Sequence, residues 1–202
     1  MCRRVLNDVS KRIPSLSVES VLDFGAGTGS GVWASASVFP DLQSVKCVEP
    51  APYMRELGQA LCEPLKSNDY ANRSTQSCTE SDTAHEGDGD GDGDGFAKPQ
   101  VSWVETLASV DDTERFPIVM TSFVLREMPG AQKVQVLEKL WKHCSGALII
   151  IDTATEEGSK SVLDARRHIL KAFANDASVL APVCHNHRHQ LTETHHHHNC
   201  VS

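Results

Sequence analysis

The sequence predicts an α/β fold built on a doubly wound, mostly parallel sheet. Short apolar runs alternate along the chain with longer segments whose apolar residues recur at helical spacing. One of these runs is followed directly by a glycine-rich turn and then by a helical segment, as in units that bind a ligand at a strand end. The chain has 202 residues, which is long enough for one domain with a sizeable core. Strands that alternate with helices in this way pair in parallel and are covered by helices on both faces.

Five strands and four helices are expected in alternating order. The strands are short apolar runs, and we place them at 20–24, 45–48, 101–104, 117–121 and 147–151. The helices have apolar residues three or four positions apart, and we place them at 31–39, 52–65, 131–144 and 158–174. Residues 1–14 are amphipathic and basic. We interpret them as a further helix packed on the sheet, with the start of a mitochondrial presequence as the alternative.

The chain divides into two halves of one domain, an insertion and a tail. Residues 1–66 form the first half with the glycine turn, and residues 100–178 form the second half. Residues 67–99 are predicted to be a disordered insertion, because their Ser, Thr, Asp and Gly bury too little apolar area to fold. The alternating aspartates of this insertion lack the glutamate that an EF-hand calcium loop needs at its last position. Residues 179–202 form a His- and Cys-rich tail, and we expect the sheet to lack its C-terminal strands.

Composition excludes some classes of protein and leaves others open. Residues 78–97 contain seven acidic residues and no Lys or Arg, so the net charge of −8 becomes −1 for the rest of the chain. The charge of the folded part therefore gives no information about the kind of partner. The seven cysteines are scattered without a Cys-x-x-Cys pair, which favours a reducing compartment over a disulfide framework. No run of about 18 apolar residues occurs, so no membrane span is expected.

The glycine-rich turn is the most informative motif. It comprises Asp23, Gly25, Ala26, Gly27 and Gly29, and it lies between a strand and a helix. Glycine at these positions allows a tight turn and lets the backbone approach a ligand. The sixth position of the motif is Ser rather than the Gly or Ala of a dinucleotide-binding turn. An aspartate two residues before the first glycine suits a ligand with a cationic amino acid end. Both features favour S-adenosylmethionine over NAD.

Glu49 ends the second strand, where an acidic side chain can accept hydrogen bonds from both hydroxyls of a ribose. The alternative interpretation is a plain strand-to-helix turn followed by a solvated glutamate. Because strand, turn, helix, strand and acid occur in order, we favour a nucleoside ligand. The predicted residues that bind S-adenosylmethionine are Asp23, Gly25, Ala26, Gly27, Gly29 and Glu49.

Several segments resemble one family. Residues 20–30, residues 121–129 and residues 148–152 are similar, in this order, to methyltransferase-like proteins that assist assembly of the mitochondrial small ribosomal subunit. The resemblance implies a Rossmann-like class I methyltransferase fold that binds S-adenosylmethionine. It also implies contacts with ribosomal RNA and proteins of the mitochondrial small subunit, a mitochondrial location, and an iron-sulfur cluster held by cysteines.

The C-terminal tail departs from this family. The family's cysteine is displaced by one place to Cys184, and His189 stands where a further cysteine is expected. The chain ends at residues 195–202 without the remaining cluster cysteines of the family, so we expect a truncated or divergent chain. Cys184, His185 and His189 are the candidate ligands for an iron-sulfur cluster or zinc, with a flexible low-complexity tail as the alternative.

No catalytic residue is predicted. Residues 122–129 follow the fourth strand but lack the Asn-Pro pair of many enzymes that methylate base amines. We interpret Glu127 as a carboxylate at a helix start and Arg126 as a surface cation, with catalytic or RNA-facing roles as alternatives. Three functions follow: a methyltransferase acting on RNA, a non-catalytic ribosome assembly factor with the same fold, and an NAD-dependent oxidoreductase.

Overall fold

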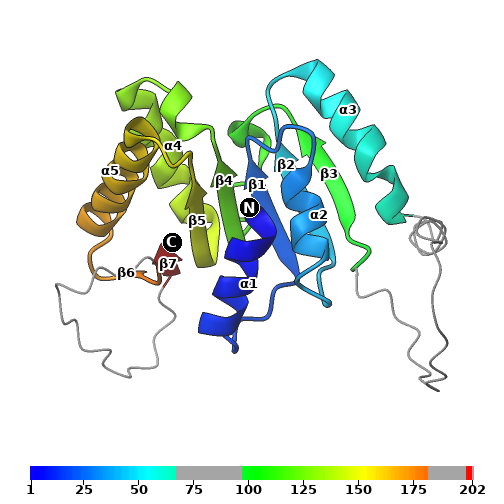
Figure 1. Ribbon diagram of the computed structural model, residues 1–202, viewed down its shortest axis with the longest axis horizontal. Helices are drawn as coiled ribbons and strands as arrows, with labels where there is room; N and C mark the ends of the chain where they lie inside the picture. Colours follow the sequence, from blue (N-terminus) through cyan, green and yellow to red (C-terminus); the bar gives the residue numbers. More distant parts are fainter. Residues whose placement is uncertain (67–96, 182–198, 202) are drawn as a thin grey trace, which may run out of the picture.

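The computed structural model describes residues 1–66, 97–181 and 199–201, and Figure 1 labels their helices and strands. The strands are β1 (Ser20–Phe24), β2 (Ser44–Val48), β3 (Gln100–Val104), β4 (Phe116–Ser122), β5 (Cys144–Ile151), β6 (Ala177–Val179) and β7 (Asn199–Val201). The α-helices are α1 (Cys2–Arg12), α2 (Ser30–Ala36), α3 (Pro52–Cys62), α4 (Gly130–His143) and α5 (Glu156–Ala172). Short 3-10 turns are η1 (Glu63–Lys66), η3 (Leu107–Ser109) and η4 (Leu125–Glu127).

The described strands form one sheet in the order β3-β2-β1-β4-β5-β7-β6, and neighbouring strands pair in parallel. The central strand β1 pairs with β2 on one side and with β4 on the other. The chain order therefore reverses at β1, and this reversal makes the carboxyl ends of β1 and β4 the expected ligand edge of the sheet. The prediction of a doubly wound parallel sheet is confirmed.

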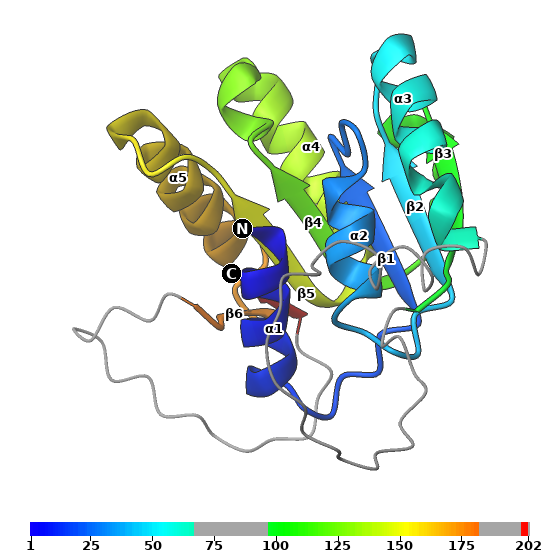
Figure 2. The same cartoon turned by 45° about the vertical axis from the view of Figure 1, so that its right-hand side comes forward.

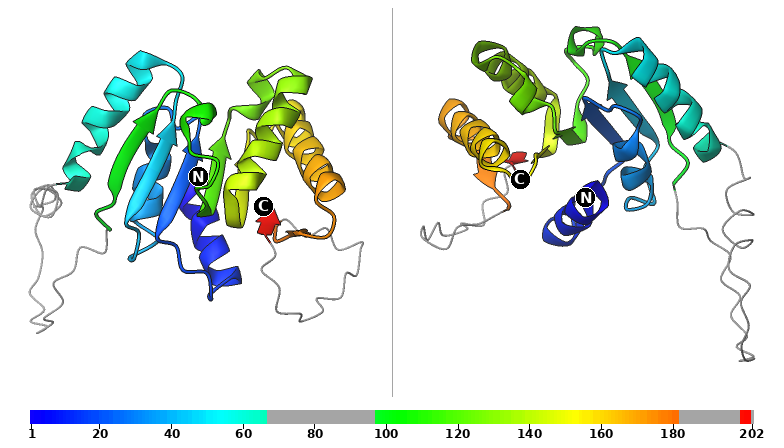
Figure 3. Two further views of the ribbon diagram at one scale, coloured as in Figure 1. Left: turned by 180° about the vertical axis from the view of Figure 1, so that it is seen from behind. Right: turned by 45° about the horizontal axis from the view of Figure 1, so that its top comes forward.

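Helices cover both faces of the sheet. On one face α1 and α2 lie over the strands, as Figure 2 shows, and the apolar residues of α1, α2 and α3 join those of β1 and β2 in one core cluster. On the other face α4 and α5 cover the sheet, as the view from behind in Figure 3 shows, and their apolar residues belong to a second cluster. Alternate residues of β1 enter different clusters: Val21 packs in the first and Leu22 in the second. This alternation follows from the twofold repeat of a strand.

The predicted N-terminal helix is confirmed as α1. Its buried side chains are Cys2, Leu6 and Val9, three or four positions apart, and they face the sheet and α2. Its basic residues are exposed. None of the described helices is long and apolar enough to cross a membrane.

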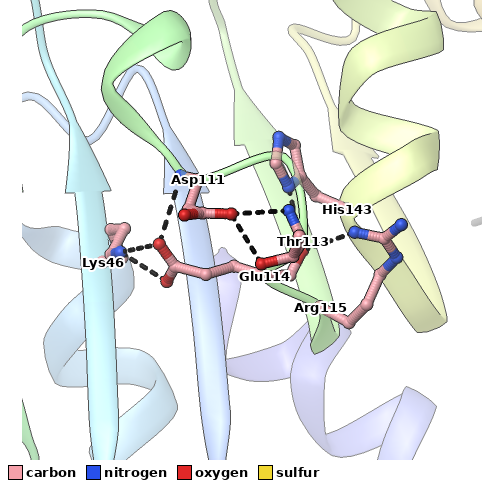
Figure 4. A network of polar contacts seen from close by, with 6 residues as sticks. All are labelled: Lys46, Asp111, Thr113, Glu114, Arg115 and His143. Carbon is pink, nitrogen blue, oxygen red and sulfur yellow. Dashed lines mark hydrogen bonds and ion pairs between the residues drawn. The ribbon is translucent and has the colours of Figure 1, made fainter.

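A polar network closes the edge of the sheet opposite to the glycine turn (Figure 4). Lys46 of β2 pairs with Glu114, which precedes β4, and the carbonyl oxygen of Glu114 lies 3.0 Å from Nδ1 of His143. Asp111 accepts hydrogen bonds from the backbone N–H and the hydroxyl of Thr113 at 2.8 and 2.6 Å. The network joins β2 to the starts of β4 and β5, so its role is structural.

The structure differs from the predictions at a few boundaries. The helix expected at 52–65 is α-helical only to Cys62, because Pro64 interrupts its hydrogen bonding and the last residues form η1. Most of the predicted insertion, residues 67–96, lies outside the described residues, but Ala97 is already buried, and its N–H donates to the carbonyl of Ala36 at 2.9 Å. The C-terminal strands expected to be lacking are represented by β6 and β7, whose three residues each are too few to produce a sequence pattern.

Candidate functional site

The predicted glycine turn connects β1 to α2 and has a left-handed backbone at three positions. The φ angles are 75° at Gly25, 55° at Gly27 and 88° at Gly29. The backbone N–H groups of Gly25 and Ala26 donate to the carbonyl of Val48 at 2.8 and 3.2 Å, which ties the turn to the end of β2. The turn therefore lies at the carboxyl edge of the sheet, beside the position where the chain order reverses.

The glycines of the turn differ in what surrounds them. A Cβ atom at Gly25 would collide with the side chain of Val124, and one at Gly29 would lie 2.6 Å from Sγ of Cys62. A Cβ atom at Gly27 would meet only the terminal methyl of Met54, at 3.8 Å. Gly25 and Gly29 are therefore required by packing. At Gly27 the end of Met54 is the one described contact within 4 Å of a Cβ atom, and we call this open space beside Gly27 the hollow.

Glu49 turns toward this hollow. Its Oε2 accepts a hydrogen bond from the N–H of Gly27 at 2.9 Å, and its Oε1 accepts one from the N–H of Ala51 at 3.0 Å. Its backbone carbonyl accepts a hydrogen bond from the guanidinium of Arg55 at 2.6 Å. The side chain is largely buried, so these contacts fix its direction. A carboxylate has about four acceptor positions, and two remain for ligand hydroxyls.

Asp23 lies below the turn, at the end of β1. Its side chain is only 3% exposed, and within the described residues no hydrogen bond or ion pair is made by its carboxylate. Burial, and next the negative charge of Glu49, raise the pKa of Asp23 to about 7. A Cβ atom at Gly31 would collide with this carboxylate, so the start of α2 packs directly against it. A buried carboxyl without a donor is suited to receive a cationic group.

The structure brings a residue that sequence reasoning missed to the same edge. Phe123 follows β4 and has a φ of 64°, which is unusual for a residue other than glycine. Its N–H donates to the carbonyl of Ile151 at 2.8 Å, and the next residue, Val124, packs on Gly25. Phe123 is 37% exposed. Backbone strain has no sequence pattern, so only its position after an apolar strand could have indicated this residue.

Arg126 and Glu127 occupy the turn η4 after β4. Nε of Arg126 lies 3.7 Å from Oδ1 of Asp152, whose side chain is nearly inaccessible at the end of β5. Glu127 is exposed and lines a cavity of about 510 Å³ together with Lys133 and Lys160. These contacts support the interpretation of a surface cation and a surface carboxylate.

The candidate metal ligands Cys184, His185 and His189 lie outside the described residues, so metal binding by the tail stays a prediction. In the part of the chain that the structure describes, no group of three or more His, Cys, Asp and Glu side chains is arranged to hold a metal ion. Cys2, Cys47, Cys62 and Cys144 are buried and form no disulfide among the described residues.

Comparison with known proteins identifies the family. The family profile described as mitochondrial small ribosomal subunit Rsm22 matches residues 1–200. The chain belongs to the Rsm22 family. A human relative of this Rsm22 chain is "Ribosome assembly protein METTL17, mitochondrial", with 25% identity over 170 residues, which are 83% of this chain and 32% of the human protein. The chain thus spans about a third of the length of the curated relative it matches.

Solved methyltransferase structures are similar in fold to this chain. The plantazolicin methyltransferase BpumL in complex with SAH has a TM-score of 0.53 at 11% identity, over 87% of this chain and 66% of that chain. A putative RNA methyltransferase from Pyrococcus horikoshii has a TM-score of 0.48 at 14% identity, over 82% of this chain and 65% of that chain. The predicted Rossmann-like class I methyltransferase fold is confirmed, together with membership in a methyltransferase-like family of the mitochondrial small ribosomal subunit.

Proposed function

We propose that this Rsm22 chain binds S-adenosylmethionine at the glycine turn and acts in assembly of the mitochondrial small ribosomal subunit. The observation that carries the first part is that two carboxylates lie at the glycine turn, Glu49 bonded to Gly27 and Asp23 packed against Gly31. Glu49 accepts a hydrogen bond from Gly27 at 2.9 Å, and Asp23 lies buried and unpaired beneath the same turn. A Cβ atom at Gly27 would have only the end of Met54 within 4 Å among the described residues.

Each residue has a distinct part in this binding. The backbone of Gly27 lets the ligand approach without a Cβ atom in the way. Glu49 accepts hydrogen bonds from the two ribose hydroxyls with the acceptor positions that Gly27 and Ala51 leave. Asp23 pairs with the ammonium group of the amino acid end, which lowers its pKa and removes the cost of its burial. The bound ligand supplies a methyl group on a sulfonium centre.

Two observations support the second part. The family profile covers nearly the whole chain, and its description names the mitochondrial small ribosomal subunit. The human relative is named as a mitochondrial ribosome assembly protein. We accordingly propose a mitochondrial location and contact with the RNA and proteins of the small subunit.

Methyl transfer to RNA is the alternative to assembly without turnover. The end of β4 favours assembly without turnover, because its last residue Ser122 and the following Phe123 bring no titratable side chain to this edge of the sheet. A basic or acidic group near the methyl group is not always needed for transfer, so activity must be measured.

The test has two measurements on the same protein. In the first measurement, the wild-type chain is mixed with mitochondrial small subunits, and the fraction of the chain that sediments with them is measured. Transfer of labelled methyl from S-adenosylmethionine to the RNA of these subunits is then measured with wild type and Glu49→Gln. Co-sedimentation with background labelling supports an assembly factor. Labelling that Glu49→Gln abolishes establishes an enzyme, and failure to co-sediment contradicts the proposed role.

A further inference from the structure

A groove of about 1190 Å³ runs between α1 and the start of α5. Its floor is the end of β5 and the residues that follow it, Ile150 to Ala154. One wall is the basic side of α1 and the other is the side of α5 that carries Ser159, Val162 and Leu163. The groove exceeds the volume of about 300–1,000 Å³ of ordinary small-molecule pockets. It is therefore large enough for part of an extended polymer.

The α1 wall carries three cations without counterions. Arg3, Arg4 and Lys11 are exposed and line the groove, and none makes an ion pair or side-chain hydrogen bond with any residue that the structure describes. The fourth cation, Arg12, is neutralised by Asp8 at 2.8 Å. Elsewhere several cations are paired, as Lys46 is with Glu114. The three charges thus remain available to an anionic partner.

Their spacing suits successive phosphates of one strand. Arg4, Asn7 and Lys11 follow at intervals of three and four residues, so they lie along the same side of the helix. Arg4 and Lys11 are seven positions apart, which corresponds to about 10 Å along the helix axis. Two cations this far apart on one side of α1, with Arg3 next to Arg4, match the backbone of a nucleic acid better than a single small anion.

The opposite wall indicates an unpaired strand. Leu163 is 51% exposed although it is apolar, and Val162 and Ile151 continue the apolar surface into the groove. The remaining acid of the floor, Asp152, is nearly inaccessible and lies beside Arg126. A cationic wall facing an apolar wall fits phosphates on one side and exposed sugars and bases on the other, whereas a duplex presents phosphates on both of its edges.

The groove opens at the same edge of the sheet as the glycine turn. Sγ of Cys2, at the start of α1, lies 3.8 Å from the hydroxyl of Ser122 at the end of β4. Ser122 is also the register partner of Ile151 in the groove floor. Because β5 pairs with β4 and β4 pairs with β1, the groove floor at the end of β5 lies two strands away from the turn that follows β1.

We propose that the groove between α1 and α5 binds single-stranded RNA through Arg3, Arg4 and Lys11. This inference rests on the proposed function for the identity of the polymer and adds the surface that contacts it. Binding is electrostatic in origin and has little sequence preference, since phosphates carry no base information.

The test measures binding of a fluorescent, mixed-sequence single-stranded RNA by anisotropy over a range of salt concentrations. The triple variant Arg3→Gln, Arg4→Gln, Lys11→Gln is compared with a control that removes three exposed cations of α4 and α5, Lys139→Gln, Lys142→Gln, Lys171→Gln. Losing three phosphate contacts is expected to weaken binding about tenfold or more and to lower the salt slope by about 2, at about 0.7 per contact. The control is expected to retain both values.

A second variant tests the groove rather than the outer side of α1. Ser159→Glu places a negative charge on the α5 wall, in the first turn of a helix where an acid is tolerated. We expect it to weaken RNA binding while thermal unfolding stays unchanged. Wild-type affinity in either groove variant overturns the inference, as does equal weakening by the control, or displacement of the RNA by polyglutamate at equal charge. Binding of S-adenosylhomocysteine, measured on the same samples, distinguishes failure of the proposed donor site from failure of this surface.

Discussion

The N–H of Gly27 donates a hydrogen bond to Oε2 of Glu49 at 2.9 Å, although the two residues belong to different strand-to-helix connections. This contact links the turn after β1 to the segment after β2 and aims the carboxylate at the one glycine of the turn that faces open space. Arg55 and Ala51 hold Glu49 from the other side. The candidate site is thus formed by the fold itself.

Replacement of Gly27 and of Gly29 by alanine is expected to have different effects. Gly27→Ala adds a methyl group with room around it, at a left-handed φ of 55°, so it is expected to cost about 1 kcal/mol of stability and to weaken donor binding. Gly29→Ala places a Cβ atom 2.6 Å from Cys62 Sγ and is expected to cost about 3 kcal/mol. Urea unfolding of the two variants measures the difference. Equal losses of stability contradict the assignment of Gly27 to the hollow.

Asp23 makes stability depend on pH. Its pKa is about 7 in the folded protein and about 3.8 ordinarily, so between these values the folded state holds a proton that the unfolded chain has released. Stability is therefore lost as pH rises from about 4 to 7. Asp23→Asn removes this loss and is expected to exceed the wild type by up to about 4 kcal/mol at pH 7.5, from about three pKa units at about 1.4 kcal/mol each. Denaturant unfolding at pH 4 and 7.5 checks this, and a difference that does not change with pH speaks against a protonated Asp23.

Donor affinity is expected to change with pH in the opposite direction. An ammonium group pairs with the ionised form of Asp23, so binding must release the proton that this residue holds below pH 7. The affinity for S-adenosylhomocysteine should rise by up to about tenfold per pH unit between pH 5 and 7. Asp23→Asn should bind more weakly at pH 7.5 and show no such rise. A pH-dependent affinity that survives in Asp23→Asn would assign the effect to another group.

The polar network at the opposite edge supplies a variant that changes stability alone. His143 is buried, its Nδ1 lies 3.0 Å from the carbonyl oxygen of Glu114, and its ring packs edge-on against Phe116. His143→Ala leaves a cavity and an unpaired carbonyl, and we expect a loss of about 2–4 kcal/mol (Figure 4). Below the unfolding temperature its affinity for S-adenosylhomocysteine should equal that of the wild type. Weaker binding by the folded variant would show that the two edges of the sheet are coupled.

The sequence predicted the elements whose residues repeat with a clear period. Sequence patterns were clear for the elements that are long or strongly apolar, namely β1, β2, β4, β5, α4 and α5. The glycine turn and Glu49 indicated at which edge of the sheet a ligand would bind. The strands β6 and β7 were missed because three residues carry no period.

Details that depend on contacts between distant residues could not be predicted. Met54 borders the hollow at Gly27, and Arg55 holds the backbone of Glu49, yet both look like ordinary helix residues in the sequence. The backbone conformation of Phe123 depends on the neighbouring strand, through the carbonyl of Ile151. Such features arise from tertiary packing and leave no local pattern.

Calorimetric titration of the chain with S-adenosylhomocysteine tests the central claim most directly. We predict saturable binding to the wild type, a loss of about 10- to 100-fold in Glu49→Gln from about 1.5–3 kcal/mol of charge-assisted hydrogen bonding, and no heat with NAD. Glu105→Gln, at a neighbouring carboxylate that is 67% exposed, should bind like the wild type. Binding of NAD in place of S-adenosylhomocysteine, or unchanged affinity in Glu49→Gln, would contradict the claim.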